Sequence, residues 1–182
     1  MKHVLVLINQ LTDSASADER DVLDQAEVVE RTLSLMGYRV SRASMGADLE
    51  KTRRDILSSG ADIVFNLVES VDNRADLTHI PPTLLSEMGI PFTGSGPEAM
   101  YLTSNKPEAK KLMRQKRIKT PEWYSADESW RANGNGVYII KPLYEDASVG
   151  IDDNSIFRGY EPVRVVEYGL RYGDSFFCGG IH

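Results

Sequence analysis

The sequence has only one cysteine, Cys178, among its 182 residues. No disulfide can form within the chain, which excludes a small disulfide-stapled fold and favours a reducing compartment. A long apolar run is also lacking. The segment Val4–Ile8 is too short for a membrane span or for the apolar core of a signal peptide. These absences predict a cytoplasmic protein with no membrane partner.

An excess of positive charge is lacking too, because the formal net charge is −6. Proteins that bind nucleic acids usually present a basic face to the phosphates, so the overall charge argues against a nucleic-acid partner. The segment 106–119 is the exception. Its basic residues are Lys106, Lys110, Lys111, Arg114, Lys116, Arg117 and Lys119, opposed only by Glu108. A solvated helix face is the usual explanation of such a run, and a nucleic-acid-binding helix is the alternative.

Several motifs of catalysis and metal binding are absent. His3, His79 and His182 are scattered, and the sequence contains neither a C-x-x-C nor an H-E-x-x-H motif. There is no G-x-x-x-x-G-K-[ST] loop, which excludes a P-loop nucleotide site. No metal ligands and no Ser/His/Asp set can be proposed from spacing.

The first half of the chain alternates apolar strands with amphipathic helices. Gly37 and Gly60 stand where left-handed residues would end two of the helices. Repeated strand–helix–strand units predict a parallel sheet. The expected strands are 4–8, 38–40, 62–66 and 90–92, and the expected helices are 22–36, 49–59 and 82–88.

A domain boundary is expected at the turn-forming segment Thr93–Pro97. Gly94–Ala99 fits the G-x-G-x-x-A dinucleotide fingerprint, but Pro97 lacks a donor that a phosphate would need, so a tight interdomain turn is the better interpretation. We therefore expect domains at 1–95 and 96–182. The second should contain a helix over 105–116, a hairpin-type turn at 133–136 and a strand over 137–140.

Two segments suggest binding chemistry. The strand Tyr138–Pro142 carries Lys141 and precedes a small-residue loop, 145–150. A lysine fixed on a strand and the N–H groups of such a loop suit a nucleotide phosphate, although a surface lysine followed by a turn is about equally favoured. Glu69 follows the third strand, at the sheet edge where ligands bind in open α/β folds. It could meet an amine or simply lie in a solvated loop.

Taken in order, these pieces resemble the D-alanine–D-alanine ligase branch of the ATP-grasp family. The matching segments are Phe65–Ser70, Leu84–Ser95, Ser104–Lys106 with its helix, Ile118–Pro121 and Ile139–Gly150. The resemblance extends from Met1 to about Ile151. It implies an α/β fold, in which a Rossmann-like (pre-ATP-grasp) parallel-sheet domain is followed by an incomplete α+β ATP-grasp subdomain.

The resemblance also implies an activity and a set of site residues. The family joins two amino acids with ATP and magnesium, through an acyl phosphate. Lys106 and Lys141 would contact the ATP phosphates, and the loop from Glu145 through Ala147 and Ser148 to Gly150 would close over the triphosphate. Asn66 and Glu69 would line the first amino-acid site, and the substrate would be an amino acid or a dipeptide.

The sequence departs from the family pattern in the loop and at the first amino-acid site. The family loop reads Glu-Gly-Ser-Ser-x-Gly, whereas Asp146 and Ala147 replace its glycine and first serine here. Glu69 stands where these ligases commonly carry histidine. These differences leave the identity of the amino acid open.

The last residues differ most. The family continues through a hinge of the type Phe-Phe-Ala-Glu-Glu-Tyr-Ile into a third domain with the magnesium ligands, but this chain reads Phe176-Phe177-Cys178-Gly179-Gly180-Ile181-His182. One inserted base after Phe177 would explain the difference, and sequencing the gene beyond that point tests this. We expect a truncated chain, inactive as a ligase, with an exposed seam that favours a homodimer. A non-catalytic remnant that binds a small ligand or partner is the alternative.

Overall fold

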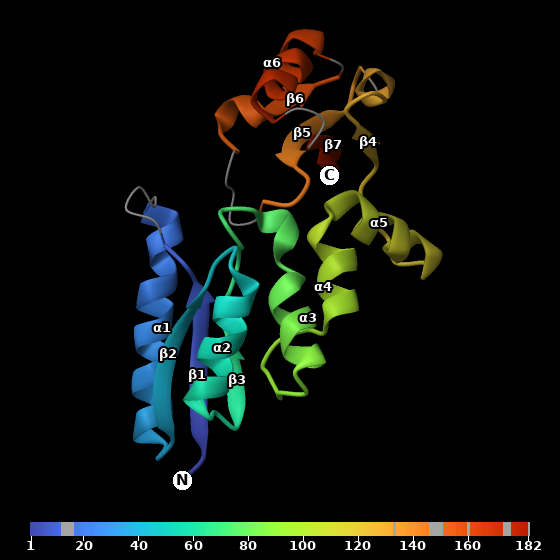
Figure 1. Ribbon diagram of the computed structural model, residues 1–182. Coiled ribbons are helices and arrows are strands. Elements are labelled where there is room, and N and C mark those ends of the chain that lie inside the picture. The colour runs from blue at the N-terminus through green and yellow to red at the C-terminus, as the bar shows by residue number, and fades with distance from the viewer. Residues whose placement is uncertain (12–16, 133, 146–150, 160, 173–175, 182) are drawn as a thin grey trace. The chain divides into compact units, whose positions relative to one another are not determined.

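The computed structural model describes residues 1–11, 17–132, 134–145, 151–159, 161–172 and 176–181. The chain divides into two compact units, Met1–Tyr101 and Leu102–His182 (Figure 1). The division into domains at 1–95 and 96–182 stays a prediction.

Unit 1 contains a parallel sheet of the kind that the sequence predicts. Its strands are β1 (His3–Asn9), β2 (Arg39–Met45) and β3 (Ile63–Asn66), in the order β2-β1-β3. Both pairings are parallel, with Leu7 opposite Asn66 at the end of β3. Helices α1 (Ala17–Leu35) and α2 (Leu49–Ser59) connect the strands. The fold class expected from the sequence is confirmed.

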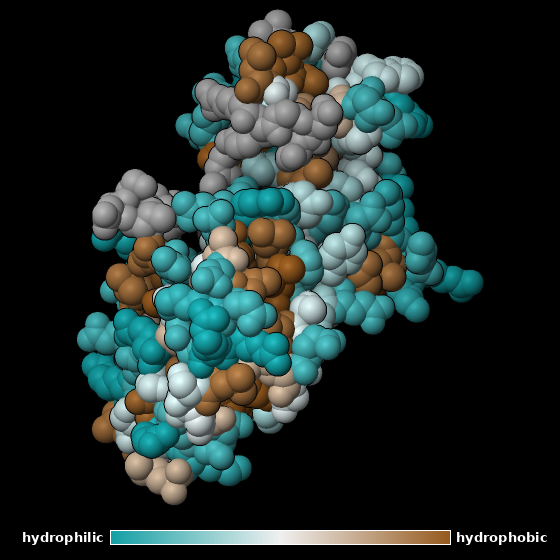
Figure 2. All heavy atoms as spheres, in the orientation of Figure 1, coloured by the Kyte–Doolittle hydropathy of each residue, from teal (hydrophilic) through white to brown (hydrophobic). Residues whose placement is uncertain are grey.

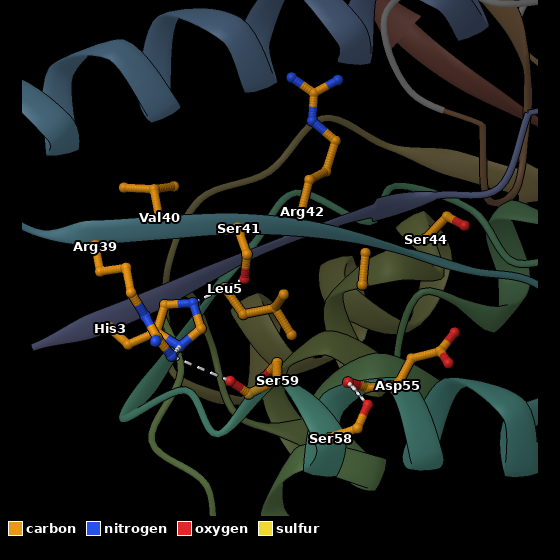
Figure 3. A pocket seen from close by; sticks show the side chains of 11 residues that line it. His3, Leu5, Arg39, Val40, Ser41, Arg42, Ser44, Asp55, Ser58 and Ser59 are labelled. Carbon is orange, nitrogen blue, oxygen red and sulfur yellow. Dashed lines mark hydrogen bonds between the residues drawn. The ribbon is translucent and has the colours of Figure 1, made fainter.

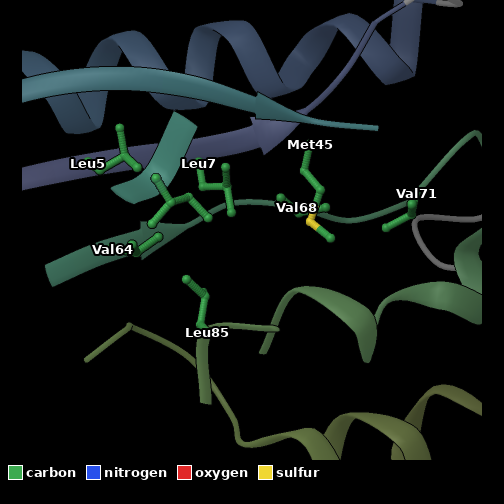
Figure 4. Close-up of a cluster of buried hydrophobic side chains, with 8 residues drawn as sticks. Leu5, Leu7, Met45, Val64, Val68, Val71 and Leu85 are labelled. Carbon is green, nitrogen blue, oxygen red and sulfur yellow. The ribbon is translucent and has the colours of Figure 1, made fainter. Parts of the chain in front are cut away.

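The continuous apolar sequence of β1 reflects burial on both faces of the sheet. Every residue of this strand is buried. Val6 and Ile8 pack against Val22 and Ala26 of α1. On the opposite face, side chains from all three strands, from α2 and from α3 (Ile80–Glu87) form one cluster (Figure 4). That cluster consists of Leu5, Leu7, Met45, Ile56, Val64, Val68, Val71 and Leu85.

The helix ends of unit 1 follow local sequence signals. Asp48 caps α2, with its carboxylate accepting a hydrogen bond from the Lys51 amide at 2.8 Å. Gly37 and Gly60 have φ values of 85° and 61°, the left-handed conformation that glycine adopts without strain. Both predicted helix ends are therefore confirmed.

The segment after β3 corrects one prediction and adds an element. Instead of a strand over 90–92, only Phe92 bridges to Val64, in parallel. The reason is local, because Pro91 has no N–H to donate and Gly94 turns the chain with φ 101°. A short 3-10 turn (Ala75–Leu77) precedes α3, and α4 (Pro97–Ser104) follows Phe92. The sequence analysis did not predict α4.

Unit 2 contains an antiparallel sheet of order β4-β7-β5-β6. Its elements are α5 (Lys106–Gln115), β4 (Trp123–Ser125), β5 (Val137–Pro142), β6 (Ile156–Arg158), α6 (Pro162–Tyr172) and β7 (Phe176–Ile181), with 3-10 turns at Ser129–Arg131 and Asp153–Ser155. Of the hairpin-type turn predicted at 133–136, where residue 133 lies outside the described residues, the turn is confirmed but the hairpin is wrong. A turn is present at 134–135, but β7 lies between β4 and β5 and pairs with both.

Burial alternates along β5 and so separates a core face from an open face. Tyr138 and Ile140 join the unit 2 core with Phe157, Tyr168 and Phe176, whereas Val137, Ile139 and Lys141 are only half-buried. Two faces of different character follow from the period of two in a strand.

None of the described helices is long and apolar enough to cross a membrane. The face drawn in Figure 2 is mostly hydrophilic, with separate hydrophobic patches.

Candidate functional site

The first turn of α5 is fixed by Asn105. Its side-chain oxygen accepts a hydrogen bond from the Glu108 amide at 3.1 Å, and its amide nitrogen donates to the Tyr144 hydroxyl at 3.1 Å. The Lys106 amide donates to the Leu143 carbonyl at 3.2 Å. Asparagine is a favoured N-cap residue because it satisfies an otherwise unpaired amide of the first turn. The start of α5 is thereby tied to the segment that follows β5.

A recess of about 310 Å³ lies between α5 and the open face of the unit 2 sheet. Three lysines line it: Lys106 and Lys110 from α5, and Lys141 from β5. No Asp or Glu occurs among its described lining residues. The remaining residues of the wall are Thr103, Ala109, Met113, Thr120, Pro121, Ile139, Phe177, Gly179 and Gly180. Three cations facing one small volume make it suited to an anion.

The structure thus brings together the two lysines that the sequence singles out. The Lys106 ammonium donates to the Glu145 carbonyl oxygen at 2.6 Å and approaches that of Leu143 at 3.4 Å. Glu145 therefore meets Lys106 through its backbone. The other two loop residues named from the sequence, Ala147 and Ser148, lie outside the described residues.

Lys110 is a further residue of this recess that the sequence analysis missed. Its ammonium donates to the Thr120 hydroxyl at 2.8 Å and to the Pro121 carbonyl at 3.2 Å, and it lies 5.7 Å from the centre of the Trp123 ring. Lys110 follows Lys106 by four residues, a spacing that places both on one helix face. That spacing is the signal that could have identified it.

The charge environment of Lys110 disfavours its ammonium form. Its pKa is lowered, first by burial and then by the charges of Arg114 and Lys141, while Glu122 acts in the opposite direction. Burial lowers the pKa of a lysine because the charged form loses hydration, and neighbouring cations add repulsion. Burial and neighbouring cations therefore make the charged form of Lys110 less favourable than that of a lysine in water.

Other cations of α5 have partners away from the recess. Lys111 pairs with Glu108 at 2.6 Å, and both side chains are largely exposed. Arg114 pairs with Glu122 at 2.9 Å, and its guanidinium lies 4.0 Å from the centre of the Trp123 ring. The interpretation of this helix as a solvated basic face is thus incomplete, because Lys110 faces the recess.

In unit 1, Asn66 and Glu69 lie at the carboxyl edge of the parallel sheet. The Asn66 side-chain oxygen accepts from the Val68 amide at 3.3 Å, and Glu69 accepts from Gln25 of α1 at 3.5 Å. At the same edge, at the end of β1, the side-chain oxygen of Asn9 is buried and has no hydrogen-bond partner among the described residues. A buried acceptor without a partner is unusual in proteins. The sequence analysis did not single out Asn9.

No family model matches the chain. Similar proteins and similar solved structures were found, and those given below are D-alanine–D-alanine ligases. The D-alanine–D-alanine ligase of Rickettsia akari is 29% identical over 163 residues, which cover 88% of this chain and 48% of that protein. D-alanine–D-alanine ligase B of Mesorhizobium japonicum is 28% identical over 178 residues, which cover 96% and 54%. The crystal structure of the Bacillus anthracis D-alanine–D-alanine ligase complexed with ATP matches with a TM-score of 0.71 at 16% identity and covers all of this chain and 59% of that one.

The chain resembles the D-alanine–D-alanine ligases. The resemblance covers nearly the whole of this chain in both sequence and fold. The chain spans about half the length of the curated ligases that it matches. Neither a nucleic-acid binder nor a non-catalytic remnant is favoured by the comparisons.

The resemblance implies magnesium ligands as well as a phosphate site. No group of three His, Cys, Asp or Glu side chains that could hold a metal ion occurs within the part of the chain that the structure describes. We therefore assign no magnesium ligand to the described residues. The lysine-lined recess, in contrast, has a donor set that fits a polyphosphate.

A second recess, of about 540 Å³, lies in unit 1 beside β2 and α2 (Figure 3). The Arg39 guanidinium lies 2.7 Å from His3 Nδ1 and donates to the Ser59 carbonyl at 3.3 Å, and His3 Nε2 lies 2.8 Å from the Ser41 hydroxyl. Since Arg39 can only donate, His3 donates through Nε2. These contacts join β1, β2 and the end of α2, so we infer that they stabilise the fold and do not bind a ligand.

Proposed function

We propose that this chain forms the phosphate-binding part of an ATP-dependent ligase that joins two amino acids through an acyl phosphate. The recess lined by Lys106, Lys110 and Lys141 carries this proposal. The likeness to proteins named D-alanine–D-alanine ligase, one of them crystallised with ATP, supports it.

The fit of ATP to the recess rests on charge and on position. ATP would supply the phosphoryl group that activates a carboxylate, and the negative charge of its phosphates needs compensation throughout that reaction. Lys106 and Lys141 offer this charge from a capped helix start and from a strand, two rigid elements. The wall residues Met113, Ile139 and Phe177 add apolar surface beside the lysines.

The first amino acid would bind at the sheet edge of unit 1. Glu69 supplies a carboxylate for an ammonium group, and Asn9 supplies a buried acceptor that no described residue pairs with. We include Asn66 in this site because it ends β3 at the same edge. Magnesium would accompany the phosphates, as the resemblance implies.

Calorimetric titration with Mg-ATP tests the proposal. The wild-type chain is compared with Lys141→Ala and with Lys111→Ala. Lys111 is exposed, pairs with Glu108 and does not line the recess, so it is the matched control. We expect ATP affinity to fall by about tenfold or more in Lys141→Ala and by less than about twofold in Lys111→Ala. Equal affinities in all three chains would contradict the assigned site.

The amino-acid site and the reaction need separate measurements. Binding of D-alanine, followed by ligand-observed NMR, should weaken in Glu69→Gln. Release of inorganic phosphate from Mg-ATP that depends on D-alanine, together with detection of the dipeptide product, measures the ligase reaction. The inactivity expected of this chain on its own stays a prediction that the phosphate-release assay checks.

A further inference from the structure

We propose that Lys110 is a third phosphate-binding lysine of this recess and that it selects nucleotides with longer phosphate chains. This inference rests on the proposed function, because it assigns the recess of Lys106 and Lys141 to nucleotide phosphates. It adds a residue whose position is explained neither by the solvated face of α5 nor by an ion pair within the described contacts.

The position of Lys110 is the first argument. It lines the same recess as Lys106 and Lys141, one helical turn after Lys106. Its hydrogen-bond partners among the described residues, the Thr120 hydroxyl and the Pro121 carbonyl, are neutral. They orient the ammonium without neutralising its charge, so a phosphate oxygen can still interact favourably with it.

The balance of surrounding charge is the second argument. Arg114 on the same helix and Lys141 on β5 repel the Lys110 ammonium, and the carboxylate of Glu122 is engaged with Arg114 at 2.9 Å. Lys106 faces the same recess from the first turn of α5. A bound polyphosphate would relieve this repulsion, and a longer chain would relieve more of it. A nucleoside monophosphate would gain less from Lys110 than ATP.

The repulsion between Lys110 and its neighbouring cations also predicts that ATP binding is accompanied by proton uptake. The lowered pKa of Lys110 means that part of the chain population loses this charge at alkaline pH when no anion is present. An anion restores the charged form by opposite-charge attraction. ATP binding should therefore take up protons and weaken as the pH rises toward the ordinary lysine pKa of 10.5, where the terminal phosphate of ATP no longer titrates.

The experiment compares the binding constants of ATP and AMP in the wild-type chain, Lys110→Met, Lys141→Met and the control Lys111→Met. Methionine keeps much of the length of the lysine side chain but has no charge. We expect the preference for ATP over AMP to fall by about tenfold in Lys110→Met and to stay within about twofold of wild type in Lys111→Met. Proton uptake, measured by calorimetry in buffers of different ionisation enthalpy, should decrease in Lys110→Met.

The Lys110→Arg variant separates charge from packing. Arginine stays charged across the whole pH range, so this variant should keep the preference for ATP but lose the contribution of Lys110 to proton uptake. If Lys110→Met weakened ATP and AMP binding equally, Lys110 would act only by supporting the Thr120–Pro121 wall, and the inference would be wrong.

The outcomes also distinguish this inference from the proposed function. An unchanged ATP preference in Lys110→Met, together with loss of ATP binding in Lys141→Met, would overturn the role of Lys110 alone. A wild-type chain that does not bind ATP would overturn both.

Discussion

The sheets of the two units use apolar residues in different ways. In unit 1, every residue of β1 is buried, and both faces of the sheet are covered by apolar clusters. In unit 2, only alternate residues of β5 enter the core, and the other face carries Lys141 into a recess shared with two more lysines. The first arrangement mainly stabilises the fold. In the second, three lysines of like charge share one recess, and their repulsion is unfavourable.

This difference indicates where binding chemistry is concentrated. Like charges held in a recess destabilise a chain unless a ligand compensates them. Opposite charges meet in both units, as in the pairs Arg42–Glu30 of unit 1 and Lys111–Glu108 of unit 2, whereas the recess gathers three lysines with no Asp or Glu among its described lining residues. The lysine recess is thus the stronger functional candidate of the two units, and substitutions in each sheet can test the comparison.

The largest effect is expected from Leu7→Ala. Leu7 is fully buried in the unit 1 cluster, so its truncation removes apolar contacts and leaves a cavity. The free energy of unfolding should fall by about 2–5 kcal/mol. Ile139→Ala, a truncation on the recess face of β5, should be less destabilising because Ile139 is only half-buried. Urea unfolding measures both, and equal losses would contradict the difference between the sheets.

The next effect concerns Cys178, which is completely buried in β7. Burial raises the pKa of its thiol from 9.0 to about 12. In the unfolded chain the thiol ionises near its ordinary pKa, so the folded state binds more protons between the two values. The stabilisation from Cys178 is complete below about pH 9 and decreases as the pH rises toward 12, by on the order of 2–3 kcal/mol at about pH 11.

Unfolding measured from about pH 8 to about pH 11 checks this expectation. The Cys178→Ala variant leaves a small cavity at every pH, but it should lack the decrease that comes from the thiol. The slope of stability against pH, and not its absolute value, is therefore the quantity to compare. The same alkaline decrease in both chains would show that the thiol is not its cause.

Much of unit 1 could be predicted because its signals are local. The apolar run Val4–Ile8 indicates burial on both faces, and Gly37 and Gly60 mark helix ends through their left-handed backbone. The antiparallel order of unit 2 could not be predicted in the same way. Phe176–Ile181 enters between β4 and β5, and that pairing depends on segments distant in the sequence.

The candidate site was only partly accessible from the sequence. Lys106 and Lys141 were found through an ordered resemblance. The residue type of Lys110 does not separate it from the solvated cations around it, and only the four-residue spacing from Lys106 hints at its position. Asn9 gave no signal either, because an asparagine after a strand is also a common loop residue.

A smaller effect is expected from Asn105→Ala at the start of α5. The substitution removes the hydrogen bond to the Glu108 amide and the contact with Tyr144. Loss of a helix N-cap costs about 1 kcal/mol. Because Lys106 follows immediately, ATP affinity should also weaken by several-fold. Asn105→Asp, which keeps the capping oxygen, should preserve the helix start, and thermal unfolding followed by circular dichroism compares the three chains.

The smallest effect is expected for the pair Arg42–Glu30, which joins β2 to α1. Its two contacts measure 2.5 and 2.7 Å, and this hydrogen bond raises the pKa of Arg42. Both side chains are partly exposed, so solvent screens most of the attraction. A double-mutant cycle with Glu30→Gln and Arg42→Met should give a coupling of less than about 1 kcal/mol.

Added salt should reduce that coupling, since the two charges attract each other. Salt should act oppositely in the lysine recess, where it screens the repulsion among Lys110, Lys141 and Arg114. The pair in unit 1 would thus lose stabilisation under the conditions in which the lysine recess gains it. A coupling in unit 1 that grew with salt concentration would mean that Arg42 and Glu30 do not interact mainly through charge, and the contrast between this pair and the lysine recess would fail.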